Sequence, residues 1–356
     1  MLKNLILLIC VIAILSMAGC GDSSNNPIVI PTPTFTPTPT SSVTVTPTST
    51  PTVTPTATPT GGISAWSELS PATSPSERYG HTMVSINGTG YMFGGYDNVK
   101  LPPSVYNDLW QWPSGSNQFS QILPTTASPS VRYNHTAVVY NGKMYIYGGM
   151  GEFLTIYSDL WVYDPLLNSW EEITPSGTKP SGKVYHIAGV AGDKMIIAGG
   201  YNSGETWIYD FTGNSWSRKT DFPGDYTLIA RAPCTVYNNK FYVFTSPGNT
   251  LYVYDPALDT WTQKTAIGNV PSTIRAGTAS LADNEVFICG GETDLNNPVN
   301  TTYKFNLSNF SWTSLDNMPL ALSYSASTLL TNGNLLLFGG RGSDVKSTKK
   351  TLLYKR

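Results

Sequence analysis

Internal repetition limits what this chain can fold into more than any other feature of its sequence. A pair of glycines follows an apolar run five times, at Gly94-Gly95, Gly148-Gly149, Gly199-Gly200, Gly290-Gly291 and Gly339-Gly340. A sixth apolar run, Phe241–Phe244, is followed by Thr245-Ser246 instead. Two series of aromatic residues share this rhythm at an offset of nine: Trp110/Phe119, Trp161/Trp170, Trp207/Trp216, Tyr252/Trp261 and Tyr303/Trp312. A constant offset predicts a hairpin of constant length in every repeat.

Each repeat predicts four short strands, which we call a, b, c and d in chain order. Residues 136–140 are typical of strand a, residues 241–244 of strand b and residues 160–164 of strand c. The a–b turns carry residue pairs that tolerate positive φ, as type I′ hairpins require. These pairs are Asn87-Gly88, Asn141-Gly142, Asn238-Asn239, Asp283-Asn284 and Asn332-Gly333. The pattern indicates an all-β fold.

The two ends of the repeat region are complementary. The last repeat has strands at 325–330, 335–338 and 351–354, and the sequence stops at Arg356 before a strand d. Residues 65–69, around Trp66, form a strand d with no repeat of their own. Joining the two closes a ring and removes open sheet edges. We therefore expect a six-bladed β-propeller, closed by the N-terminal strand as the outer strand of the last blade.

The repeat unit resembles the kelch family from Trp66 to Arg356. Repeat two carries the family's motifs most fully, with Arg132, His135, Gly148-Gly149, Tyr163-Asp164-Pro165 and Trp170. The fourth repeat lacks the glycine pair, and the last has Ser323 and Ala326 where the motif's Arg and His would fall. The resemblance implies a kelch-type propeller.

The N-terminal region predicts export. Lys3 precedes an apolar run at 5–15, too short for a membrane span. Ser16-Met17-Ala18-Gly19-Cys20 resembles a bacterial lipobox, with Cys20 as the lipidated residue; the alternative is an ordinary secretory signal with an incidental Cys20. Pro and Thr make up 22 of the 30 residues at 31–60, which predicts a disordered tether.

The expected organisation is therefore a signal peptide at 1–19, a tether at 20–62 and a propeller at 63–356. We expect a lipid-anchored bacterial protein held to the membrane through Cys20. Gly21, where an Asp often marks inner-membrane retention, favours an outer-membrane or cell-surface location.

Charge and cysteine content exclude several classes of function. The formal net charge is −2 and no dense Lys/Arg run occurs, so we expect no nucleic-acid partner. Of the four cysteines, only Cys234 and Cys289 fall in the repeats, and two unclustered cysteines make neither a disulfide framework nor a zinc site. We expect both in buried strands, and we expect a monomer without cofactors.

Candidate binding residues gather on one face. The b–c and d–a connections are long and emerge together on what we call the long-loop face, where recognition usually resides. The candidates there are Arg78, Asp97, Arg132, Glu152, Lys183, Tyr201, Glu205, Glu292, Asp294 and Arg341. Arg78, Arg132 and Lys183 occupy equivalent repeat positions, which favours a structural role, and the loop acids have solvated rim positions as their alternative.

A binding role and a catalytic role remain open. His81, His135 and His186 occupy one repeat position, which favours hydrogen bonds within or between blades over a shared metal ion. Kelch-like propellers include copper-radical sugar oxidases, whose Tyr–Cys pair has no counterpart here, and a sialic-acid mutarotase. A mutarotase site would need an acid facing an arginine, for which Glu152, Glu292 and Arg341 are candidates. We expect a non-catalytic module that binds protein or glycan through the long-loop face.

Overall fold

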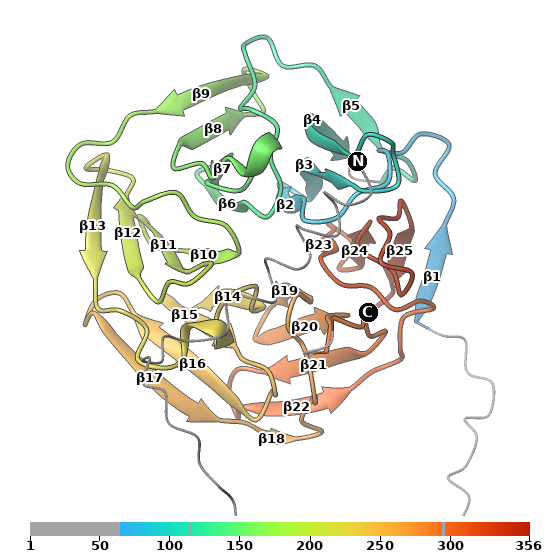
Figure 1. Cartoon of the computed structure of the whole chain (residues 1–356). Helices are drawn as coiled ribbons and strands as arrows, with labels where there is room; N and C mark the ends of the chain where they lie inside the picture. The colour runs from blue at the N-terminus through green and yellow to red at the C-terminus, as the bar shows by residue number, and fades with distance from the viewer. Residues whose placement is uncertain (1–64, 114, 294–295) are drawn as a thin grey trace, which may run out of the picture. The chain divides into compact units, whose positions relative to one another are not determined.

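The computed structural model describes residues 65–113, 115–293 and 296–356, which form six antiparallel β-sheets around a central axis (Figure 1). The all-β, six-bladed propeller expected from the repeats is confirmed. Only two helical segments occur among these residues, η1 (Glu152–Leu154) and η2 (Tyr226–Leu228), both three residues long. None of the described helices could cross a membrane. The predicted signal peptide, Cys20 and the whole of the predicted tether lie outside the described residues.

The strands follow the expected a–b–c–d order from the axis outward in blades one to four. Blade one holds β2 (Thr82–Ile86), β3 (Thr89–Asp97), β4 (Ser104–Trp112) and β5 (Ser120–Ile122). Blade two holds β6 (Thr136–Tyr140), β7 (Lys143–Tyr147), β8 (Leu160–Asp164) and β9 (Ser169–Ile173). Blade three holds β10 (His186–Ala191), β11 (Lys194–Gly199), β12 (Thr206–Asp210) and β13 (Ser215–Lys219). Blade four holds β14 (Cys234–Tyr237), β15 (Lys240–Phe244), β16 (Thr250–Asp255) and β17 (Thr260–Thr265).

The last two blades depart from this plan at their outer edges. Blade five holds β19 (Thr278–Ala282), β20 (Glu285–Cys289), β21 (Thr302–Asn306) and β22 (Ser311–Ser314), and the short β18 (Ile267–Gly268) pairs in parallel with β22. Blade six holds β23 (Ala326–Leu329), β24 (Leu335–Phe338) and β25 (Thr351–Tyr354), with β1 (Trp66–Leu69) as its outer strand.

Strand β1 closes the ring as expected (Figure 1). It pairs antiparallel with β25, with Trp66 opposite Tyr354. The Trp66 ring is buried against the Tyr354 ring at 5.1 Å, and its Nε1 donates to the Thr302 hydroxyl of blade five at 3.1 Å and to the Asp316 carbonyl at 3.0 Å. A tryptophan is therefore required here for both its apolar area and its single donor.

The aromatic residues of strand d seal each blade to the one before it. Four of them meet the ring that precedes the glycine or Thr-Ser pair of the previous blade. These contacts are Phe338–Phe119 at 5.0 Å, Phe93–Trp170 at 5.0 Å, Tyr147–Trp216 at 5.2 Å and Phe244–Trp312 at 5.7 Å. Edge-to-face and tilted contacts at such distances are the favoured geometry for aromatic pairs. The repeated aromatic position thus has a packing explanation.

The glycine pair allows the next blade to come close. Gly94 has φ of +69°, and a Cβ there would lie 2.6 Å from the Arg132 carbonyl oxygen of blade two. Gly148 meets the Lys183 carbonyl oxygen of blade three in the same way. A side chain at either position would clash with backbone, which explains why glycine recurs.

Blade six differs from the sequence expectation by one residue. Ala326 pairs with Phe338, the residue before the glycine pair, as Thr82 pairs with Phe93 in blade one. The loop between β23 and β24 is one residue longer, so Ser325 occupies the histidine position that the sequence spacing gave to Ala326. Leu322, rather than Ser323, then occupies the arginine position.

The type I′ turns expected between strands a and b are confirmed only in part. Both turn residues have positive φ in blades one, two and four, but only Asp283 does in blade five and only Gly333 in blade six.

Candidate functional site

A central pocket of about 280 Å³, which we call the channel, opens where the six blades meet. Each blade contributes four successive residues to its lining, beginning one residue before the histidine position. In blade one these are Gly80, His81, Thr82 and Met83. The channel is thus built by the starts of the six inner strands, and its mouth opens on the long-loop face.

A closed ring of backbone hydrogen bonds forms the mouth. The first lining residue of every blade has positive φ: Gly80, Asn134, Tyr185, Arg231, Ala276 and Tyr324. Each donates its N–H to the carbonyl of its counterpart in the preceding blade, at 2.7 to 3.3 Å. The bond from Gly80 to Tyr324 completes the circle at 3.0 Å. This left-handed ring fixes the backbone where the six blades meet.

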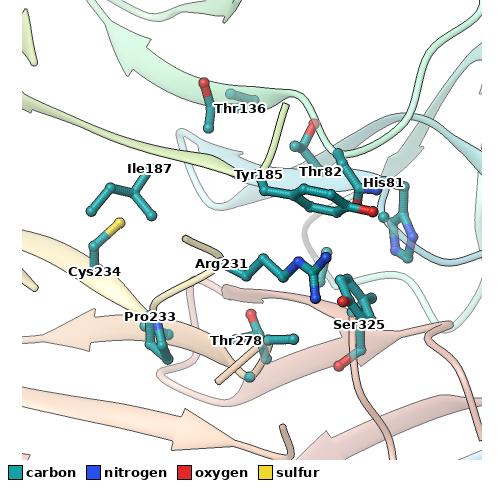
Figure 2. A pocket seen from close by; sticks show the side chains of 18 of the residues that line it. His81, Thr82, Thr136, Tyr185, Ile187, Arg231, Pro233, Cys234, Thr278 and Ser325 are labelled. Carbon is teal, nitrogen blue, oxygen red and sulfur yellow. The ribbon is translucent and has the colours of Figure 1, made fainter. Parts of the chain in front are cut away.

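Three members of the ring are bulky residues in a backbone conformation that costs them energy. Tyr185, Arg231 and Tyr324 have φ of +63°, +65° and +55°. Such outliers persist where surrounding structure holds them, and they concentrate at functional sites. Figure 2 shows Tyr185 and Arg231 extending side by side into the pocket, with the Arg231 guanidinium 3.8 Å from the centre of the Tyr185 ring.

Two further arginines join Arg231 around one buried carboxylate. Arg231 Nη1 lies 3.6 Å and Arg275 Nη2 3.5 Å from Glu292 Oε1, and Arg341 Nη2 bonds to Glu292 Oε2. The Tyr324 hydroxyl donates to Glu292 Oε1 at 3.1 Å. We call Arg231, Arg275 and Arg341 the arginine cluster. Among the described residues, it brings three positive charges to one negative charge at the channel mouth.

Tyrosine rings surround this cluster. The Tyr79 ring contacts those of Tyr96, Tyr133 and Tyr324 at 5.4, 6.5 and 5.8 Å, and Tyr96 stacks on Tyr133 at 4.9 Å. Burial is the main cause that raises the pKa values of Tyr79, Tyr133 and Tyr324 far above their ordinary value. These hydroxyls therefore stay protonated, and the mouth is walled by neutral aromatic surface.

The three histidines bind across blade boundaries rather than to one another. His135 Nε2 hydrogen-bonds the Thr82 hydroxyl of blade one at 2.9 Å, and His186 Nε2 bonds the Thr136 hydroxyl of blade two at 2.8 Å. The His81 ring packs against Phe338 of blade six. No group of three or more metal-ligating side chains lies together within the described ranges. The hydrogen bonds between blades that the sequence led us to expect are present for His135 and His186, whereas His81 contacts the neighbouring blade through its ring.

The repeat-equivalent cations Arg78, Arg132 and Lys183 lie in buried ion pairs. Arg78 binds Asp108 through two hydrogen bonds of 2.6 and 2.9 Å, and Arg132 binds Asp159 through two of 2.7 Å. Lys183 pairs with Glu205 at 2.9 Å. Arg78 and Arg132 have no exposed side-chain surface, and Lys183 is also buried. This geometry supports the structural alternative, and a binding role for the three stays a prediction.

The remaining candidates are only partly brought together. Glu292 and Arg341 meet at the mouth, whereas buried Asp97 accepts hydrogen bonds from Tyr106 and Ser347 at 2.9 and 3.0 Å. Glu152 and Tyr201 are exposed in the b–c connections of blades two and three. Asp294 lies outside the described residues. A binding role for each of these residues stays a prediction.

The sequence analysis missed Tyr185, Arg231, Arg275 and Tyr324. A signal for the ring did exist: in blades one to five its member lies fourteen residues before the glycine or Thr-Ser pair, and Arg231 lies fourteen before Thr245. Nothing in the sequence indicated that this position is left-handed. Both cysteines lie in strands as expected, but only Cys289, in β20, is buried, whereas Cys234 at the start of β14 is half-buried because it lines the channel.

Exposed apolar side chains stand in the b–c connections around the mouth. They belong to blades one, two, three and six, and we call them the apolar rim: Val99, Leu101, Phe153, Leu154, Ile156, Tyr201 and Val345. Phe153 is 97% exposed. Phe153, Leu154 and Val345 also have positive φ, of +53°, +60° and +64°.

Comparisons with known proteins agree with this architecture. Residues 63–246 match the family model of the KLHDC2/KLHL20/DRC7 Kelch-repeats domain, and residues 168–355 match that of the Attractin/LZTR1 beta-propeller. The Leucine-zipper-like transcriptional regulator 1 homolog of Drosophila melanogaster is 26% identical over 293 residues, which span 74% of this chain and 29% of that protein. Host cell factor 2 of Homo sapiens is 34% identical over 157 residues, 38% of this chain and 19% of that protein.

A solved structure adds support for the fold alone. The structure of YjhT superposes with a TM-score of 0.62 at 15% identity and covers 80% of this chain and 96% of its own. The chain spans less than a third of the length of each of the two curated relatives described above.

Proposed function

Because the chain belongs to the kelch-repeat β-propeller family, we propose that it is a non-catalytic interaction module that binds a protein partner through its long-loop face. The propeller is a rigid scaffold, and its variable connections on one face are suited to recognition. Glycan binding is the alternative ligand class on the same face. The experiment below separates the two.

One observation carries this proposal: bulky apolar residues stand exposed in left-handed backbone at the rim. Phe153, Leu154 and Val345 each adopt a conformation that costs an L-residue about 1–2 kcal/mol and leaves its apolar surface in water. The second of these costs, the exposed apolar surface, is not offset by packing within the described propeller. A partner that covers these side chains would repay the second cost on binding.

A sugar-active site has weaker support. Glu292 and Arg341 do face each other, as a mutarotase-like site would need. The Glu292 side chain, however, is fully buried, and its oxygens already contact three arginines and Tyr324. A carboxylate in this position holds the cluster together and has no free side to meet a sugar.

We also propose that the propeller is exported and lipid-anchored through Cys20. The lipobox-like segment and the Thr/Pro-rich tether are its support. The variant Cys20→Ala is expected to be released from the membrane fraction in soluble form, as measured by fractionation and immunoblotting. Undiminished recovery of this variant with membranes would contradict the anchor.

The binding proposal is tested by comparing two faces of the same molecule. Phe153→Asp places a charge on the apolar rim, whereas Leu166→Asp changes a side chain that is 93% exposed in a c–d turn of the opposite face. We expect pull-downs from exported proteins to lose a specific partner with Phe153→Asp and to keep it with Leu166→Asp. Equal retention in both variants contradicts the proposal. If enzymatic deglycosylation of the exported proteins abolishes their capture by the propeller, the ligand is a glycan instead.

A further inference from the structure

We propose that the propeller opens where blade six meets blade one, and that a clasp between two loops on the long-loop face keeps this junction closed. We call the contact between these blades the closing junction. At the other five junctions the chain runs directly from one blade into the next. Strands β23, β24 and β25, in contrast, are held to β1 and to blade one by non-covalent contacts alone. The inference goes beyond the proposed binding function and does not depend on it.

A histidine–threonine hydrogen bond fastens the inner strands at two of the other junctions. His135 of blade two bonds the Thr82 hydroxyl of blade one at 2.9 Å, and His186 of blade three bonds the Thr136 hydroxyl of blade two at 2.8 Å. Each threonine begins an inner strand, opposite the residue that precedes the glycine pair. The bond therefore joins the starts of neighbouring inner strands beside the channel.

The closing junction keeps the histidine but not its partner. The three rings are placed alike, since each lies 5.6 Å from the ring before the neighbouring glycine pair: His81–Phe338, His135–Phe93 and His186–Tyr147. Ala326, opposite Phe338, takes the place of the threonine. Alanine has no hydroxyl, and His81 Nε2 is buried without a hydrogen-bond partner in the described part of the chain. A buried polar atom left in this state weakens the structure around it.

Three hydroxyl groups of the same region share this condition. Ser323, Ser325 and Thr351 are buried, and their hydroxyls have no hydrogen-bond partner within the described propeller. Ser325 occupies the histidine position of blade six, and Thr351 lies opposite Leu69 where β25 pairs with β1. The inner part of the closing junction thus makes fewer side-chain hydrogen bonds than its polar residues could support.

A clasp on the long-loop face compensates for this deficit. The Asn98 amide of blade one bridges to the backbone of blade six: its Nδ2 donates to the Val345 carbonyl at 2.8 Å, and its Oδ1 accepts from the Ser347 N–H at 2.7 Å. The Ser347 hydroxyl donates to the buried Asp97 carboxylate at 3.0 Å. We call Asp97, Asn98 and Ser347 the loop clasp.

Internal hydrogen bonds hold the loop clasp in place. Asp97 also accepts from the Val99 N–H and from the Tyr106 hydroxyl, both at 2.9 Å. The two clasped loops carry Val99 and Val345 of the apolar rim. Opening of the closing junction would therefore separate these two side chains and divide the rim.

The first test supplies the missing hydroxyl. Ala326→Thr places a threonine where blades one and two already have one, and Ala326→Val adds a side chain of similar shape without the hydroxyl. Amide hydrogen exchange of the full chain, followed by mass spectrometry, reports local opening. We expect exchange in β1, β23 and β25 to be about fivefold slower with threonine than with valine, because one hydrogen bond is gained. The strands of blade three should exchange equally in both variants.

The second test removes the loop clasp without burying a charge. Asn98→Ala deletes both bonds of the bridging amide. Asn107→Ala is its matched control, because the Asn107 amide donates to the Pro129 carbonyl at 3.1 Å, in the connection that leads from blade one to blade two. We expect Asn98→Ala to accelerate exchange in β1 and β25 at least fivefold more than Asn107→Ala does. Adding Ala326→Thr to Asn98→Ala should restore part of the protection.

Three results would overturn the inference. They are equal exchange in the threonine and valine variants, equal effects of Asn98→Ala and Asn107→Ala, and acceleration by Asn98→Ala that is spread evenly over six blades. A threonine variant that melts at a lower temperature than the valine variant counts against it as well, because the gained hydrogen bond should then be present. These measurements need no partner, so they can fail while the binding proposal stands, and the reverse also holds.

Discussion

Arginine has two roles in this propeller, and the number of carboxylates around each guanidinium separates them. Arg78 and Arg132 are completely buried and have one carboxylate each. Burial opposes ionisation of Asp159, but the hydrogen bonds and charge of Arg132 outweigh it and hold the pKa of that carboxyl below its usual value. These pairs secure a blade, whereas Arg231, Arg275 and Arg341 share Glu292 at the channel mouth.

The buried pair Arg132–Asp159 gives a direct prediction of stability. Asp159→Asn leaves the Arg132 charge buried without a counter-charge, which should lower the free energy of unfolding by about 3–5 kcal/mol. Urea denaturation measures this change. As a matched control, Asp221→Asn breaks an exposed pair with Arg218 and is expected to leave the midpoint unchanged. Similar midpoints for both variants would show that the buried pair has no special role.

The histidines predict that stability depends on pH. Burial, and then the charge of Arg78, lowers the pKa of His81 to about 3, and burial with the charge of Lys183 does the same for His186. His135 is shifted in the same direction, mainly by burial. The unfolded chain takes up protons near pH 6.5 and the folded chain does not, so stability should fall as pH drops from 6.5 toward 3.

Denaturation at several pH values between 7.5 and 4.5 tests this slope, because the carboxylates titrate mostly below that range. Each histidine should contribute up to about 1.4 kcal/mol per pH unit. The variant His186→Gln should show a shallower slope than the parent protein. A free energy of unfolding that is flat across this interval contradicts neutral buried histidines.

At the level of the element, strand β1 is the part on which closure depends. Strand β1 lies at the start of the described residues, and it completes blade six, whose other strands are β23, β24 and β25. Antiparallel pairing of β1 with β25 therefore closes the propeller. Trp66 links this strand to blade five through Thr302 and Asp316. Loss of this contact exposes a sheet edge and loosens two blades.

Trp66→Ala is expected to lower the free energy of unfolding by about 3–5 kcal/mol, since it removes a buried indole and its hydrogen bonds. Amide hydrogen exchange should show faster exchange in β25 and β1, with the strands of blade three little changed. Uniformly faster exchange in all six blades would indicate that β1 has no separate role in closure.

Sequence patterns predicted most of the fold at this scale. Glycine pairs and aromatic spacing were sufficient for blade number, strand order and closure, because each pattern reports a contact that every blade must make. The spacing placed the histidine position of blade six at Ala326, where the structure has Ser325, since one extra turn residue shifts the count. The left-handed ring was missed because its members range from Gly80 to Arg231, so no residue type marks the position.

The candidate site was therefore predicted only in part. Glu292 and Arg341 were identified from their place after a glycine pair, and they do meet at the mouth. Arg231 and Arg275 were missed, because their approach depends on how blades four, five and six pack side by side. Contacts of this kind depend on the geometry of the whole propeller and leave no local pattern.

For the whole molecule, the two faces of the disc differ in chemistry. The long-loop face combines the arginine cluster, the tyrosine walls and the apolar rim around one channel mouth. The opposite face carries short a–b and c–d turns, including exposed leucines such as Leu166 and Leu258. Exposed apolar side chains occur on both faces, but Phe153, Leu154 and Val345 on the long-loop face have positive φ, whereas Leu166 and Leu258 do not.

Site-specific photo-crosslinking measures most directly which face a partner covers. A benzophenone amino acid is placed at Phe153 on the long-loop face or at Leu166 on the opposite face, in otherwise identical propellers exposed to the same exported proteins. The account predicts a discrete crosslinked species from position 153 and none from position 166. A partner crosslinked from position 166 and not from 153 would contradict it.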